Sequence, residues 1–122
     1  MAFLFENLDV YRLSLSFHNK VISLCKSKKF CGYYHLVDHL KRSSLSVALN
    51  LAEGNGRFHA KDKRNFYAMA RGSAFECVPI ITLCINNEIL TTDEAQSLRD
   101  DLERLSMMMT GLMRSVESKA AR

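Results

Sequence analysis

The sequence predicts an all-α protein, an antiparallel up-down four-helix bundle. Apolar residues recur at steps of three and four along four long segments, which is the period of a helix buried on one face. Short connections separate these segments, and the strict alternation of apolar and polar residues that is typical of strands does not occur. The 122 residues have the length of one domain, which we expect to span 1–122 with a frayed tail from about 118.

The first helix is expected from about Leu8 to Cys25, and it carries two apolar rows. One row is Leu8, Tyr11, Leu15, His18, Ile22 and Cys25, and the other is Val10, Leu13, Phe17, Val21 and Leu24. A single row is enough to bury a helix in a small bundle. We therefore expect the second row to pack against another copy of the chain. The stretch KSKKFCGYY, with lysines that suit a helix C-terminus and Gly32, ends this helix.

The second and third helices are expected over about 35–53 and 61–87, joined by the stretch GNGRFHA. Small residues on the second helix permit a close approach of its neighbours: Ser43, Ser44, Ser46, Ala48 and Ala52. Gly54 is expected to cap that helix in left-handed geometry, and Gly56 to complete the turn. Pro79 falls inside the third helix, where we expect a kink without a break because the apolar period continues through it.

The fourth helix has the most regular pattern and is expected to begin at a cap formed by Thr91 or Thr92. Its apolar row follows alternating steps of three and four, typical of nearly parallel helix packing: Ala95, Leu98, Leu102, Leu105, Met109, Leu112 and Val116. This row predicts that the helix contributes one continuous face to the core.

Composition narrows the class of protein. The chain is 48% hydrophobic, lacks a run of about 20 apolar residues and has no basic N-terminal leader, so we expect a cytoplasmic protein with no membrane span. The four cysteines are then expected to be thiols. Three of them, Cys25, Cys77 and Cys84, fall on apolar stripes, which favours a role in the core.

Charge is unevenly distributed. Residues 10–75 hold twelve Lys or Arg and three acidic residues, whereas the remainder holds five and ten. Such asymmetry indicates a polyanionic partner or a complementary protein surface, with a merely solvated face as the alternative.

Motifs for catalysis are weak. Gly54 and Gly56 follow a helix, not a strand, and lack the third glycine of a dinucleotide fingerprint. His35 and His39 stand four residues apart, but HLVDH lacks the Glu of a zinc-protease helix. We therefore predict no enzyme, no metal and no cofactor. The polar residues Asn50, Glu53, Arg71 and Glu76 are predicted to form a structural network, in which a partly buried Glu53 pairs with Arg57 or Arg71.

The remaining candidate site is a basic set, predicted to contact the phosphates of a nucleic acid without reading its sequence. It comprises Lys26, Lys28, Lys29, Lys41, Arg42, Arg57, His59, Lys61, Lys63 and Arg64. The up-down path divides this set between the two poles of the bundle. Phe58 and Tyr67 lie among these charges and are candidates to stack on bases.

The stretch DHLKRSSLSVALNLAEGNGR, followed by FYAMARGSAFE, resembles the signature of a bacterial four-helix-bundle family. The family includes proteins encoded in intervening sequences of 23S rRNA genes and the accessory variability determinant proteins of diversity-generating retroelements. The resemblance rests on Leu40, Arg42, Ser46, Val47, Asn50, Ala52, Glu53, Gly54, Gly56, Arg57, Ala70, Arg71, Gly72, Ser73 and Glu76. It implies a ring oligomer, commonly a homopentamer.

The retroelement branch implies a non-catalytic accessory protein that binds a reverse transcriptase and its template RNA, or DNA or an RNA–DNA hybrid. Such a protein supports mutagenic cDNA synthesis, and RGSAFECVPII is similar to that branch. The alternative is the 23S rRNA intervening-sequence branch, which implies an oligomeric interaction protein of unclear role.

Overall fold

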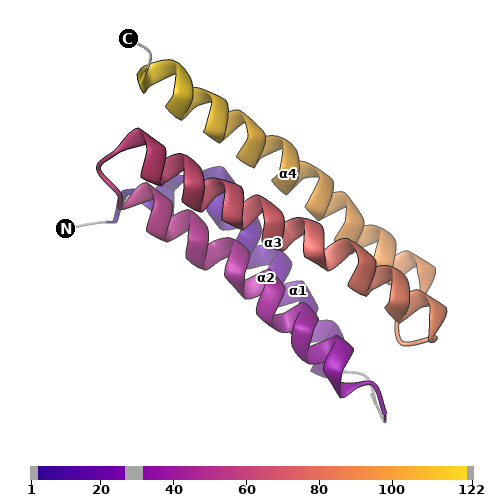
Figure 1. The fold of residues 1–122 in the computed structure, drawn as a ribbon. Coiled ribbons are helices and arrows are strands. Elements are labelled where there is room, and N and C mark those ends of the chain that lie inside the picture. Colours follow the sequence, from indigo (N-terminus) through magenta and orange to yellow (C-terminus); the bar gives the residue numbers. More distant parts are fainter. Residues whose placement is uncertain (1–2, 27–31, 121–122) are drawn as a thin grey trace.

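The computed structural model describes residues 3–26 and 32–120, and throughout that range the only regular elements are helices. A short 3-10 helix, η1 (Leu4–Asn7), precedes four α-helices: α1 (Asp9–Lys26), α2 (Tyr34–Asn55), α3 (Ala60–Asn86) and α4 (Thr92–Ala120). The all-α prediction is therefore confirmed for the described part of the chain. Consecutive helices run in opposite directions (Figure 1).

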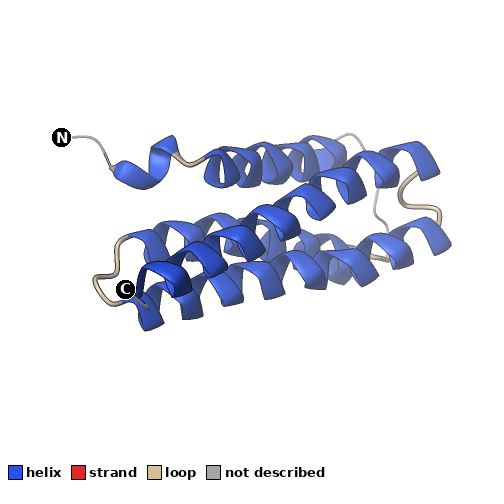
Figure 2. Cartoon of the chain, turned by 90° about the horizontal axis from the view of Figure 1, so that it is seen from above, coloured by secondary structure: helices blue, strands red, loops and turns tan. Residues whose placement is uncertain are grey.

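Each helix packs against two neighbours, which gives the bundle one shared core. Helix α1 lies against α2 and α4, and α3 lies against the same two helices. The centre of the core is formed by large side chains that are almost fully buried: Phe17, Leu51, Tyr67, Ile81, Leu98, Leu105 and Met109. Helix η1 and the end of α4 lie at the same end of the bundle as the α2–α3 connection (Figure 2).

The prediction for α1 is wrong about which row meets the core. Val10, Phe17 and Val21, from the row expected to face another copy, are buried within this chain, with Ser14 between them. The first row is mostly half-buried against the bundle, and Leu15 is exposed. The two rows thus form one wide face, with the second row at its buried centre and the first row along its side, because a helix in the corner of a bundle contacts two neighbours.

Helix α4 confirms the apolar row predicted for it. Its first five members, Ala95 to Met109, are buried, and the last two pack on the edge of the core. Thr91 is the cap: its Oγ1 accepts from the backbone N–H of Glu94 at 3.1 Å, and the Glu94 carboxylate accepts from the Thr91 N–H at 2.9 Å. This capping box pairs two N–H groups that a helix start otherwise leaves without partners. The helix continues to Ala120, into the segment expected to fray.

The prediction that Gly54 is a left-handed cap is wrong. Helix α2 continues through Gly54 to Asn55, and Gly56 caps it with a right-handed φ of −77°. Gly54 is buried, and a Cβ placed there would lie 2.8 Å from Cε1 of Tyr67. The glycine therefore serves the close approach of α3 to α2 rather than a turn.

Helix α3 runs through Pro79 without a break, as predicted from the continuing apolar period. By length and composition this helix could also cross a membrane. Core helices of water-soluble proteins meet the same criterion, and here α3 packs between α2 and α4.

Candidate functional site

The bend between α2 and α3 carries half of the predicted basic set, but much of its charge is already paired. Arg57 donates from Nη2 to Glu53 Oε1 at 2.6 Å, and its guanidinium lies 4.6 Å from the centre of the Phe66 ring. Arg64 pairs with Glu117 of α4, and Lys63 donates to the backbone carbonyl of Asn55 at 2.7 Å. A bound phosphate would have to compete with these acceptors.

His59 and Lys61 remain exposed at this bend. Phe58 is 95% exposed and is free to stack on a base. Tyr67 is only 2% exposed, so the prediction that it stacks on a base is wrong. Burial raises the pKa of the Tyr67 phenol, and a hydrogen bond with Asn55 partly opposes that rise.

The rest of the basic set lies elsewhere. Lys26 ends α1, and Lys41 and Arg42 lie about two turns into α2, toward the opposite pole from the bend. Lys28 and Lys29 lie outside the described residues. The structure therefore distributes the described members of the basic set over two zones, as the up-down path predicted.

The predicted network of Asn50, Glu53, Arg71 and Glu76 is divided among separate contacts. Glu53 is exposed rather than partly buried, and its partner is Arg57. No hydrogen bond or ion pair joins Arg71 to Glu53. Instead its guanidinium lies 4.3 Å from the centre of the Phe75 ring. The orientation of α3 about its own axis explains why Arg71 does not reach Glu53. Arg71 lies on the same helical stripe as Arg64 and Phe75, and this stripe faces α4.

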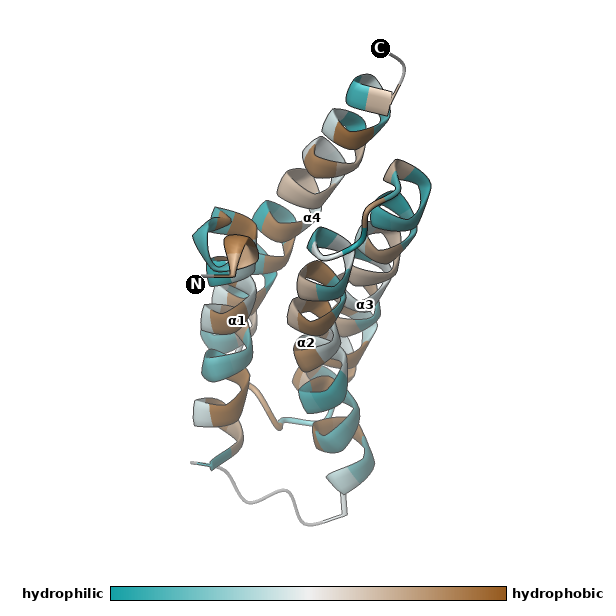
Figure 3. Cartoon of the chain, turned by 90° about the vertical axis from the view of Figure 1, so that its left-hand side faces the viewer, coloured by the Kyte–Doolittle hydropathy of each residue, from teal (hydrophilic) through white to brown (hydrophobic). Residues whose placement is uncertain are grey.

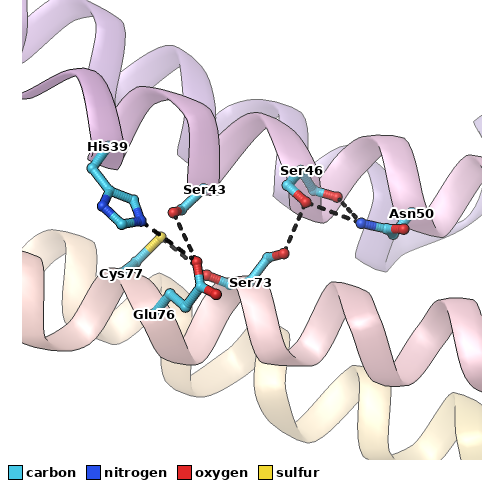
Figure 4. Close-up of polar contacts among 7 residues, drawn as sticks. All are labelled: His39, Ser43, Ser46, Asn50, Ser73, Glu76 and Cys77. Carbon is cyan, nitrogen blue, oxygen red and sulfur yellow. Dashed lines mark hydrogen bonds and ion pairs between the residues drawn. The ribbon is translucent and has the colours of Figure 1, made fainter.

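Asn50 and Glu76 do belong to a ladder of polar contacts between α2 and α3 (Figure 4). The Asn50 amide donates to the backbone carbonyl and the hydroxyl of Ser46, at 2.9 and 3.0 Å. The Ser46 hydroxyl meets that of Ser73 at 2.8 Å. Ser43 donates to Glu76 Oε2 at 3.2 Å, and His39 Nε2 lies 3.7 Å from the same oxygen.

We call this set of six residues, His39, Ser43, Ser46, Asn50, Ser73 and Glu76, the serine ladder. Its serines allow α2 and α3 to approach closely, and each of the six residues makes at least one polar contact within the set. Groups that are already hydrogen-bonded in this way have little left to offer a ligand. We interpret the serine ladder as a structural feature of the contact between α2 and α3, although Asn50 and Glu76 do not contact one another as one network.

Neither a metal site nor a reactive thiol is evident among the described residues. No group of three His, Cys, Asp or Glu side chains there is placed to hold a metal. Burial, with a smaller effect of Glu76, raises the pKa of the Cys77 thiol to about 12, so the thiolate is scarce at neutral pH. Cys84 is likewise buried and Cys25 half-buried. Cys31 lies outside the described residues.

A second polar surface, between α3 and α4, was not predicted from the sequence. An open hollow of about 390 Å³ is lined there by Arg71, Ser106, Met107, Thr110 and Arg114. It meets a second hollow of about 580 Å³, which includes Phe75, Arg99 and Glu103. A signal was present in the spacing of Arg64, Arg71, Phe75 and Val78, which places them on one face of α3.

Taken together, the fold and these surfaces define a small helical bundle with a polar ladder inside one helix pair and open polar surfaces elsewhere. The model of the 23S rRNA-intervening sequence protein family matches residues 6–111. The chain therefore belongs to this family, which is one of the two groups of proteins that the sequence was found to resemble.

Comparison with solved structures supports the fold. The chain is similar to a crystal structure described as a protein of unknown function from the S23 ribosomal protein family of Bacteroides thetaiotaomicron, with a TM-score of 0.76 and 20% sequence identity. The similarity covers 85% of this chain and 97% of the other. Among curated proteins no match was found.

Proposed function

We propose that the protein is a non-catalytic interaction module of the 23S rRNA intervening-sequence type, whose copies associate through an apolar face on α1 and α2. The observation that carries this proposal is the exposure of leucines on that face. Leu49 is 59% exposed, and Leu15 and Leu45 are exposed as well. Apolar segments are visible along both helices in Figure 3.

These leucines lie on adjoining helices. His18 of α1 and Ser44 of α2 are joined by a hydrogen bond of 2.6 Å. Leu15 lies about one turn before His18, and Leu45 directly follows Ser44. A contiguous exposed apolar patch is a typical protein–protein contact surface. We propose that this face meets a different face of the next copy and that the contact is repeated around a closed ring of five copies, because a contact between unlike faces closes into a ring when the rotation allows it.

Light scattering on the purified chain tests the association. We expect a defined oligomer, and we expect Leu45→Glu combined with Leu49→Glu to reduce the mass toward that of one chain, 13.9 kDa. Leu83→Glu is the matched control, since Leu83 is an exposed leucine of α3. A well-folded single copy at high concentration would contradict the proposal.

A second candidate is the retroelement accessory role, with a reverse transcriptase and its template RNA as partners. The observation that favours it is the free part of the basic bend, where Phe58, His59 and Lys61 are exposed together. RNA held mainly by phosphate contacts would bind more weakly as salt rises. A reverse transcriptase gene and a template repeat beside the coding sequence would favour this candidate.

RNA titration at several salt concentrations tests the second candidate. We expect His59→Ala combined with Lys61→Ala to weaken binding and to reduce the salt dependence. Arg57→Ala is the control, and we expect a smaller effect because Glu53 already holds that guanidinium. Absence of binding at low salt would exclude the RNA-binding role.

A further inference from the structure

The groove between α3 and α4 brings together two arginines and two hydroxyls. We call it the arginine groove and define it by the lining residues of the 390 Å³ hollow: Arg71, Ser106, Met107, Thr110 and Arg114. Arg71 comes from α3 and the other four residues come from α4. It lies apart from the serine ladder, which is on the side of α3 that faces α2.

Arg71 differs from the paired arginines of the chain. Arg57 and Arg64 have carboxylate partners, and Arg99 donates to Thr82 Oγ1 at 2.6 Å. Among the described residues the Arg71 guanidinium has no acceptor, and its Nε is buried without a hydrogen-bond partner. Buried donors are nearly always paired in folded proteins. The side chain of Arg71 also lines the open hollow, where an acceptor from outside the chain can reach the Nη end of its guanidinium.

The side chain of Arg71 is positioned by packing. Its guanidinium lies over the Phe75 ring, with 4.3 Å between Cζ and the ring centre. A guanidinium stacked on an aromatic face keeps its edge available for a fork of two hydrogen bonds. Met107, which is 72% exposed, adds an apolar wall to the groove.

The electrostatics of the arginine groove favour an anion. Arg71 and Arg114 are both positive, and the groove's five lining residues include no acid. On α4, Glu117 pairs with Arg64, and Glu103 lines the neighbouring hollow on the side away from Arg114. An anion between two like charges would relieve their repulsion.

We propose that the arginine groove binds a phosphate group. The Arg71 fork, the Arg114 guanidinium and the Ser106 hydroxyl come from two helices, and the tetrahedral oxygens of a phosphate point in different directions, whereas both oxygens of a carboxylate lie in one plane. Thr110 already donates to the backbone carbonyl of Ser106 at 2.9 Å, so its hydroxyl is left as an acceptor. The phosphate is carried by a small ligand or by the backbone of an RNA strand.

Isothermal titration calorimetry on the full chain, in a chloride buffer of low ionic strength, tests this proposal in two arms. One arm uses inorganic phosphate and the other a short single-stranded RNA. Charge-assisted hydrogen bonds are among the strongest that proteins make, so we expect Arg71→Gln and Arg114→Gln each to weaken binding about tenfold or more. Arg104→Gln, at an exposed arginine of α4 outside the groove, is the control, and we expect less than a twofold change.

The outcomes are distinct. Phosphate binding that depends on both arginines supports a small-ligand site, and RNA binding alone with the same dependence supports a backbone contact. Arg114 is exposed, so Arg114→Gln gives a readout even where Arg71→Gln disturbs the fold. Absence of binding in both arms, or equal losses in Arg104→Gln, would overturn the proposal. None of these results depends on whether the copies associate through α1 and α2.

Discussion

Helix α3 has two seams, and they differ in what they do with polar side chains. Away from the bend, the seam with α2 is closed: the serine ladder joins the two helices by polar contacts, and Gly54 lets Tyr67 pack directly on the α2 backbone. The seam with α4 is open, with hollows of about 390 and 580 Å³ between long side chains such as Arg71 and Met107.

The difference shows that side-chain size determines which polar residues are available to a ligand. Serines allow two helices to approach until their hydroxyls are in contact, and these hydroxyls then form hydrogen bonds within the protein. Arginine, phenylalanine and methionine extend along the surface between the helices and leave open hollows beside them. A cluster of polar residues in the sequence is therefore a weaker indication of a binding site than the distance between the two helices that carry those residues.

The largest effect expected on the closed seam is that of Gly54→Ala. The added Cβ would lie 2.8 Å from Tyr67 Cε1 and 3.0 Å from Phe66 Cβ, so the buried Tyr67 ring or the helix that carries it must shift. We expect the free energy of unfolding to fall by about 1–3 kcal/mol, measured by urea denaturation.

Gly72→Ala is the matched control for that variant. Gly72 is exposed in the middle of α3, with nothing within 4 Å of an added Cβ. Because alanine is the better helix former, we expect this change to raise the free energy of unfolding by about 0.5–1 kcal/mol. Equal losses from both substitutions would show that the α2–α3 seam is not closed at Gly54.

A smaller effect is expected within the serine ladder. Ser46→Ala removes acceptors for Asn50 and Ser73 and should lower the free energy of unfolding by about 1 kcal/mol. Because Ser46 and Ser73 share one hydrogen bond, adding Ser73→Ala should cost less than the sum of the two single changes, as a double-mutant cycle would measure. If the losses from Ser46→Ala and Ser73→Ala simply add, the two hydroxyls do not interact, which would contradict the serine ladder.

On the open seam we expect almost no effect on stability. Met107→Gln replaces a side chain that is 72% exposed, and the free energy of unfolding should stay within about 0.5 kcal/mol of the wild-type value. A loss as large as that of Gly54→Ala would mean that the two seams pack alike.

The smallest effect expected is a pH dependence at the contact between α1 and α2. Burial lowers the pKa of His18 below its usual value of 6.5, and its Nδ1 meets Ser44. The unfolded chain therefore binds more protons just below pH 6.5, so stability is full above that pH and declines as the pH falls toward the lower folded pKa. In thermal melts from pH 7.5 to 5, the melting temperature of the wild type should fall more steeply than that of His18→Asn. Parallel curves would show that His18 does not contribute to the pH dependence.

Periodicity was sufficient to predict the four helices and the buried row of α4, because both depend on local spacing. It failed at Gly54, where the choice between a cap and a helical position depends on Tyr67, a residue of the next helix. It also failed at Arg71, since pairing with Glu53 or stacking on Phe75 is decided by the rotation of α3 against its neighbours. Neither the packing of Tyr67 against Gly54 nor the rotation of α3 can be predicted from the residue spacing within one segment.

The most direct test of the contrast between the two seams is nuclear magnetic resonance on the isotope-labelled chain during a phosphate titration. The account predicts that the Nε–H signal of Arg71 and the amide signals around Ser106 and Arg114 shift and saturate, while those of Ser46 and Ser73 stay in place. Shifts confined to the basic bend at His59 and Lys61, or no saturable shift at Arg71, would contradict it.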